Sequence, residues 1–133
     1  MNPELIALTD RGARYSFLGE AFRRRQLIPN EQIVDMDFSR IEINDDDVEV
    51  LAPLTNLQGI SFWNTGITDR AIEIISGLEH LVRLNLCGTQ VTDASVPTLI
   101  ALRLDYIDVA ETNLTAEGIE KLRAGLPHAE ILV

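Results

Sequence analysis

One spacing of apolar residues recurs along this chain, and it constrains the fold more than any other feature. Three windows share it: residues 57–69 (LQGISFWNTGITD), 81–93 (LVRLNLCGTQVTD) and 104–116 (LDYIDVAETNLTA), at steps of 24 and 23 residues. Apolar side chains recur at the same four offsets: Leu57, Ile60, Phe62, Ile67; Leu81, Leu84, Leu86, Val91; Leu104, Ile107, Val109, Leu114. A threonine recurs before the last offset, as Thr65, Thr89 and Thr112, and we expect it to hydrogen-bond loop backbone between neighbouring units. A weaker copy lies at 33–45, with Ile33, Met36, Phe38 and Ile43 in register.

Each window predicts a short strand followed by a helix. Residues of a strand alternate sides, so Ile60 and Phe62 point into a core while Trp63 points outward. Thr68-Asp69 and Thr92-Asp93 place an N-capping hydroxyl and then an acid where a helix begins. The pattern therefore predicts short helices at about residues 69–76, 93–100 and 116–124.

The two ends of the chain read as caps. Residues 1–32 lack the repeat; Pro3 to Leu8 predicts a helix, Ala13 to Phe17 a strand that extends the sheet, and Leu18 to Leu27 a helical turn or loop. Stacked repeats need their apolar ends covered, so this segment is interpreted as the N-terminal cap. Residues 126–133 restart the pattern, and 130–133 would be a last strand. We expect one domain, with repeats over 33–125 and a C-terminal cap strand over 126–133.

Over residues 33–133 the LxxLxxLxLxxTxVTD pattern resembles the short bacterial leucine-rich repeats of about 24 residues, of the cysteine-containing and ribonuclease-inhibitor-like types. The best matches are Leu81, Leu84, Leu86, Thr89, Val91, Thr92 and Asp93. The resemblance implies a right-handed α/β solenoid of about four repeats, with parallel strands concave and helices convex. It implies protein recognition as the usual role and no catalytic residues. Ile41 in the threonine column and Ala116 in place of the capping acid depart from the pattern.

Composition limits the partners and the location. The formal charge is −10 and the pI is near 4.5, which argues against nucleic acid or an anionic membrane and favours a basic protein partner. The single cysteine, Cys87, excludes an intrachain disulfide. No apolar run reaches the roughly 18 residues of a membrane span, and the N-terminus lacks the regions of a signal peptide. We expect a soluble, cytoplasmic protein.

The outward positions of the strands form three columns on the expected concave face. They hold Asp35, Gly59, Arg83, Tyr106; then Asp37, Ser61, Asn85, Asp108; then Ser39, Trp63, Cys87, Ala110. Trp, Tyr and Arg are the commonest binding hot spots, so Trp63, Tyr106 and Arg83 are the candidate anchors. Asp35, Asp37, Asn85 and Asp108 complete the candidate binding residues. The alternatives are that Trp63 lies over Cys87 and Ala110 or packs on the cap, and that Tyr106 and Arg83 are ordinary surface residues.

Two charged clusters have structural explanations that are favoured over functional ones. Arg23 to Arg25 would form a solvated helix face, or else an anion or partner contact. Asp45 to Asp47, with Glu49, suggest calcium, but a calcium loop counted from Asp45 would need Gly and Glu where Val50 and Asn56 stand. These acids are interpreted as the start of a helix.

Catalysis is not expected. Asp37 and Asp108 should lie about 14 Å apart, three strands from each other, whereas a glycosidase pair needs about 5–9.5 Å. His80 lies roughly 20 Å along an extended chain from Cys87. No cofactor or metal is predicted. The hypothesis is a non-enzymatic protein-interaction module; the alternatives are a structural or self-associating subunit and, less favoured, a metal-assisted hydrolase using Asp35 or Asp37. The sequence leaves the oligomeric state open.

Overall fold

The computed structural model describes residues 3–17 and 30–133. The expectations for Leu18 to Leu27 and for Arg23 to Arg25 fall outside this range. The elements in chain order are α1 (Pro3–Asp10), β1 (Arg14–Phe17), β2 (Ile33–Asp37), α2 (Asp45–Val48), β3 (Gly59–Ser61), α3 (Asp69–Ile75), β4 (Arg83–Asn85), α4 (Val96–Ala101), β5 (Tyr106–Asp108), α5 (Ala116–Gly125) and β6 (Glu130–Leu132). Short 3-10 turns occupy Asn30–Gln32, Glu49–Leu51 and Asp93–Ser95.

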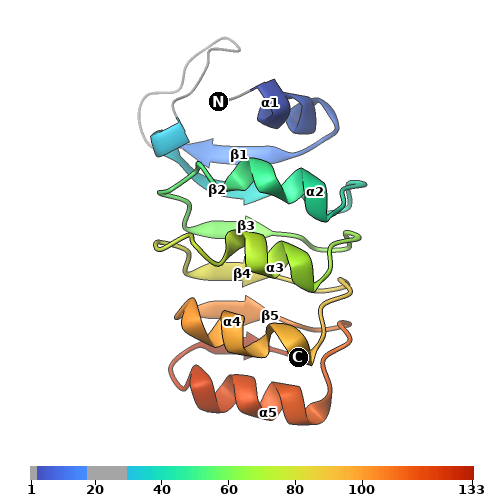
Figure 1. Ribbon diagram of the computed structural model, residues 1–133, viewed down its shortest axis with the longest axis vertical. Coiled ribbons are helices and arrows are strands. Elements are labelled where there is room, and N and C mark those ends of the chain that lie inside the picture. Colours follow the sequence, from blue (N-terminus) through green and yellow to red (C-terminus); the bar gives the residue numbers. More distant parts are fainter. Residues whose placement is uncertain (1–2, 18–29) are drawn as a thin grey trace.

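The strands form one sheet in chain order, β1 to β6. β1 is antiparallel to β2, and β2 to β6 are all parallel. Neighbouring parallel strands need a crossover connection. Helices α2 to α5, with the turns that flank them, form these connections on one side of the sheet (Figure 1). The register pairs Met36 with Ile60, Ile60 with Leu84 and Leu84 with Ile107. The repeat alignment made from the sequence is therefore the alignment of neighbouring strands.

The core lies between the sheet and the helices. The four aligned apolar columns are buried, apart from Leu114, and one cluster of buried residues runs from Leu5 in α1 to Leu126 after α5. Phe38 and Phe62, equivalent in neighbouring repeats, stack with their centroids 5.6 Å apart and an interplanar angle of 10°. α1 lies beside α2, because Glu4 and Leu8 line the same surface depression as Asp46 and Val50. The first segment thus extends both layers, as expected of a cap.

One predicted helix is split in two. The sequence predicts a helix over 93–100, but a 3-10 turn covers Asp93–Ser95 before α4 begins at Val96. Pro97 has no N–H to donate to the carbonyl of Asp93, so a continuous α-helix cannot form across this point. The helices expected near 69–76 and 116–124 are confirmed as α3 and α5, and the strand expected at 130–133 as β6.

The expectation for the repeated threonines is corrected. Their hydroxyls donate within their own unit, to the carbonyl three residues earlier: Thr65 to Phe62 at 2.8 Å, Thr89 to Leu86 at 2.7 Å, and Thr112 to Val109 at 2.7 Å. These bonds close the turn after each strand and satisfy hydroxyls that are buried or half-buried. They do not connect neighbouring units.

Aspartate and threonine side chains make that connection at the start of the helices. We call the pairs Asp45–Thr68, Asp69–Thr92 and Asp93–Thr115 the inter-unit bridges. In each, the carboxylate accepts from both the backbone N–H and the hydroxyl of the threonine, at 2.8 and 2.6 Å for Asp69. Each threonine also caps its own helix or turn by accepting from a backbone N–H. One motif therefore begins a helix and fixes it to the preceding unit.

The bridges explain why the pattern changes at the two ends. Asn44, not a threonine, caps α2, and it does so through reciprocal bonds with Asp47. Ala116 stands where the earlier units have an aspartate after the threonine, so Asp93–Thr115 is the last bridge of the described chain. The other acids of this segment form ion pairs: Asp46 and Glu49 with Arg70, and Asp47 with Arg11. Asp45 to Asp47 form the first turn of α2, as predicted.

Asp69 is the most heavily bonded member of the bridges, since Ser95 also donates to it at 2.6 Å. We expect Asp69→Ala to lower the free energy of unfolding by about 2–4 kcal/mol, because it leaves three donors without their acceptor. The control, Asp46→Ala, removes an exposed ion pair with Arg70 and should lower the unfolding free energy much less, because such pairs contribute little. Urea denaturation measures the unfolding free energy of both variants, and an equal decrease in the two would contradict a structural role for the bridge.

The same carboxyl predicts a pH dependence. Burial raises the pKa of Asp69, but the hydrogen bonds from Ser95 and Thr92 outweigh it and hold that pKa below its ordinary value. A lowered folded pKa contributes stability above the unfolded pKa, near 4, which is lost as the pH falls through the folded value. The difference in unfolding free energy between wild type and Asp69→Ala should stay constant from pH 7 to 5 and shrink below about pH 4. A difference that grew in acid would contradict this assignment.

Candidate functional site

The sheet face opposite the helices, which we call the open face, is the candidate site. Within residues 3–17 and 30–133, no helix covers it (Figure 1). The strand register confirms the first two predicted columns and adds residues of β1 and β6 to them. A shallow depression of about 350 Å³ lies over β1 to β5. The face carries Arg14, Ser16, Asp35, Asp37, Gly59, Ser61, Arg83, Asn85, Tyr106, Asp108, Glu130 and Leu132.

The β1–β4 part of this face neutralises its own charges. Asp35 accepts from Arg83 at 2.9 Å and from Ser16 at 2.9 Å, and Asp37 pairs with Arg14 at 2.7 Å. The Asp35–Arg83 pair crosses strand β3 above Gly59, where an added Cβ would overlap Asp35 Oδ1 and lie 3.3 Å from Arg83 Nε. Glycine at this position therefore allows the pair to form. Both partners are half-exposed, at 44% and 48%, so the pair is worth at most about 1 kcal/mol.

The second column has a structural task that the sequence reasoning missed. Asp37, Asn85 and Asp108 each accept from the backbone N–H two residues later, at 2.9, 3.0 and 2.9 Å. Ser61 does the same for Trp63 more weakly, at 3.4 Å. The residue after each of these turns adopts the left-handed conformation: Arg40, Asn64, Gly88 and Glu111, with φ of 61°, 53°, 72° and 56°. The available signal was that the four members of this column predicted from the sequence are only Asp, Asn and Ser, the residues that form such turns.

Hydrogen bonds from Ser39 and the ion pair with Arg14 stabilise the charged form of Asp37. Burial raises the pKa of this carboxyl, but bonds from Ser39 and the Arg14 guanidinium outweigh it and lower the pKa overall. Asp37 is thus a turn-forming group paired to a cation. Asp37 and Asp108 share a column three strands apart, as predicted.

Trp63, the first candidate anchor, is half-buried and already has neighbours. The Arg40 guanidinium carbon lies 4.3 Å from the centroid of its ring. The pKa of the Cys87 thiol is raised by burial and by the charges of Asp108 and Glu111, while a hydrogen bond from Trp63 opposes this shift. Trp63 therefore lies beside Cys87, which was one of the alternatives, and Arg40 stacks on its ring.

The β5–β6 end differs from the rest of the open face. Tyr106 and Asp108 on β5 face Glu130 and Leu132 on β6. Burial raises the pKa of Tyr106, and the charges of Asp108, Glu130 and Cys87 raise it further, which places these groups in one electrostatic environment. In the described part of the chain, neither Asp108 nor Glu130 has a cationic partner within ion-pair distance.

The remaining chemistry is sparse. His80 and His128 are exposed. Among the residues that the structure describes, no group of three or more His, Cys, Asp or Glu side chains is arranged to hold a metal ion. None of the described helices has the length and hydrophobicity that crossing a membrane requires.

The sequence placed all seven candidate residues on one side of the strands but not their partners. Asp35, Asp37, Arg83, Asn85, Tyr106 and Asp108 lie on the open face, and Trp63 lies two residues after the end of β3. Arg14, Ser16 and Arg40 were missed. Alternation within the predicted strand over 13–17 would have put Arg14 and Ser16 on one side, but their partners depend on an antiparallel register that carries no sequence signal.

Comparisons with known proteins give little sequence support. No family model matches this chain, and a search of curated proteins found no match. Among solved structures, the chain is similar to a chain of the structure of Chaetomium Mex67:Mtr2 subunits. That similarity has 12% identity and a TM-score of 0.49, and covers 69% of this chain and 77% of the other. At this level it bears on neither family nor function.

The environment of Cys87 yields a prediction. Asp108→Asn should lower the pKa of the thiol and speed its alkylation at pH 8, because a negative charge is removed while an amide oxygen can still accept from Ala110, as Asn85 does one strand earlier. Glu130→Gln is the matched control, since Glu130 is not among the groups that shift this thiol. Iodoacetamide labelling followed by mass spectrometry measures the rates. Identical rates in the two variants would contradict the proximity of Asp108 to the sulfur.

Proposed function

We propose that this chain is a short leucine-rich-repeat solenoid that binds a protein partner through the open face, its concave surface, and that it catalyses no reaction. The observation that carries the proposal is a face of six strands that no helix of the described residues covers and that presents aromatic and charged side chains. Uncovered sheet faces of stacked repeats serve as extended binding surfaces. The in-register pairing of equivalent residues and the inter-unit bridges support the repeat assignment.

A basic partner is favoured by charge. The chain carries a net charge of −10, which accelerates encounter with a cationic protein. Two acids of the open face, Asp35 and Asp37, are already paired with arginines, so they add little to specific recognition. The proposed role includes no catalysis, because the carboxylates of Asp35, Asp37 and Asp108 accept hydrogen bonds that fix strands and turns.

A self-associating scaffold is the second candidate. It is favoured by Leu132, the last residue of the edge strand β6, and by Val133 next to it, which are 40% and 58% exposed. Sedimentation separates the two candidates, because a stable dimer at micromolar concentration would favour assembly over recognition of another protein.

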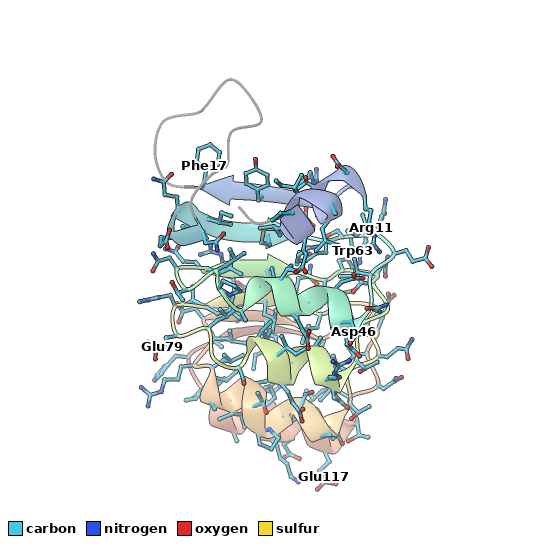
Figure 2. All side chains as sticks on the ribbon, turned by 45° about the horizontal axis from the view of Figure 1, so that its top comes forward. Arg11, Phe17, Asp46, Trp63, Glu79 and Glu117 are labelled. Atoms are coloured by element: carbon cyan, nitrogen blue, oxygen red, sulfur yellow. The ribbon has the colours of Figure 1, made fainter. Side chains whose placement is uncertain are left out.

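A capture experiment with matched variants tests the open face. Wild type, Trp63→Ala and Tyr106→Ala are used as baits in a native lysate at low and moderate salt, with folding checked by circular dichroism. We expect one of the two substitutions to reduce capture of a basic protein at least about tenfold, because buried aromatic anchors dominate interfaces. Glu79→Ala, at the opposite end of the strands from Trp63 (Figure 2), should leave capture unchanged.

The contrary outcome is equally clear. If both open-face variants capture the same proteins as wild type, and Glu117→Ala at the start of α5 (Figure 2) reduces capture, the helical face binds instead. The open face would then have no role in recognition.

A further inference from the structure

The open face divides into two parts with different electrostatics. Over β1 to β4 every acid is compensated: Asp35 by Arg83 and Asp37 by Arg14. Over β5 and β6 the acids are Asp108 and Glu130, and within the described chain no arginine or lysine lies within ion-pair distance of either. A cationic side chain that arrives at this end meets no internal competitor. At the other end it must displace an existing arginine.

The same end also carries the exposed apolar surface. Leu132 and Val133 are the exposed large hydrophobic residues of the described chain, and Leu132 shares the second column with Asp108. Tyr106 is half-buried on the neighbouring strand β5, diagonal to Leu132. An apolar side chain and an aromatic ring next to uncompensated acids distinguish this patch from an ordinary solvated acidic surface, which has no apolar part to desolvate.

The register sets the pattern of the patch. Tyr106 is paired with Glu130, and Asp108 with Leu132, so the two acids lie on one diagonal and the two apolar side chains on the other. Neighbouring strands are about 4.8 Å apart, and same-side residues of one strand about 6.8 Å apart, so the diagonals span roughly 8 Å. An extended partner segment presents alternate side chains about 6.8 Å apart, so two cationic residues on either side of an apolar one are about 14 Å apart at Cα and reach the acids with their long side chains.

From charge and register together, we propose that the β5–β6 end of the open face holds an extended basic segment of the partner. Its lysine or arginine side chains pair with Asp108 and Glu130, and an apolar side chain between them contacts Tyr106 and Leu132. This inference rests on the proposed function and names the chemistry of its partner. It also moves the centre of recognition from Trp63, whose ring Arg40 already covers, to Tyr106.

The test uses a synthetic probe, the acetylated and amidated peptide Lys-Ser-Leu-Ser-Lys, which presents Lys, Leu and Lys on one side when extended. Titration into ¹⁵N-labelled protein, followed by NMR, should shift backbone amides of residues 105–110 and 129–133. The peptide Glu-Ser-Leu-Ser-Glu should shift none of them. Binding should weaken as salt is raised from 20 to 300 mM, because exposed charges are screened.

The decisive variant removes the charges and keeps the shape. Asp108→Asn with Glu130→Gln should raise the dissociation constant about 5- to 10-fold, the range for two exposed ion pairs. Asparagine can retain the turn bond to Ala110, as Asn85 shows for Cys87. The control, Glu79→Gln with Glu120→Gln, removes the same charge from other exposed positions and should bind the probe like wild type.

The possible contrary results separate the two proposals. If the probe shifts residues 14–16, 35–37 and 83 instead, the open face still binds and the inference about its β5–β6 end is wrong. If shifts are confined to the helices, both are wrong. Lack of any shift up to about 10 mM probe, or equal affinities in the two double variants, overturns the inference and leaves the capture experiment to judge the open face.

Discussion

Each unit of one parallel strand and its crossover has an apolar side that it cannot bury alone, and this requirement governs the structure. The parallel hydrogen-bonding of equivalent strands aligns the buried columns, so that Phe38 stacks on Phe62. The inter-unit bridges fix the other edge of each unit, where the helices begin. Because strand and helix start are both held, successive units cannot slide relative to one another without losing apolar burial and charge-assisted hydrogen bonds together.

The open face follows from the same arrangement. Parallel neighbouring strands require crossovers, and these place helices on one side of the sheet, while no helix of residues 3–17 and 30–133 lies on the other side. Not every side chain of the open face is available for binding, because Asp37, Asn85 and Asp108 in the second column accept hydrogen bonds that form turns. An acidic residue on this face can therefore serve folding alone, so a column of acids is not by itself evidence of a ligand.

The sequence predicts what depends on periodicity and fails where side chains choose among partners. Strand positions, the buried columns and the helix at Asp69 follow from the 24-residue spacing. The sequence suggests that the repeated threonines bond to neighbouring units, but the Thr65 hydroxyl donates to the Phe62 carbonyl in its own turn. A free carbonyl three residues earlier is already within reach of the hydroxyl, so no acceptor from another unit is required. The Asp35–Arg83 pair spans 48 residues and crosses Gly59, and no local pattern encodes it.

Compensation of charge decides which part of an acidic face can recognise a cation. Binding over β1–β4 would exchange an internal guanidinium for an external one, so the gain at Asp35 or Asp37 is offset by the loss of the existing pair and the new desolvation. Over β5–β6 no such exchange occurs in the described chain, and electrostatic complementarity contributes in full to orientation and association rate. In the proposed function, net charge attracts a basic partner to the molecule as a whole, and the distribution of arginines selects where on the sheet that partner is held.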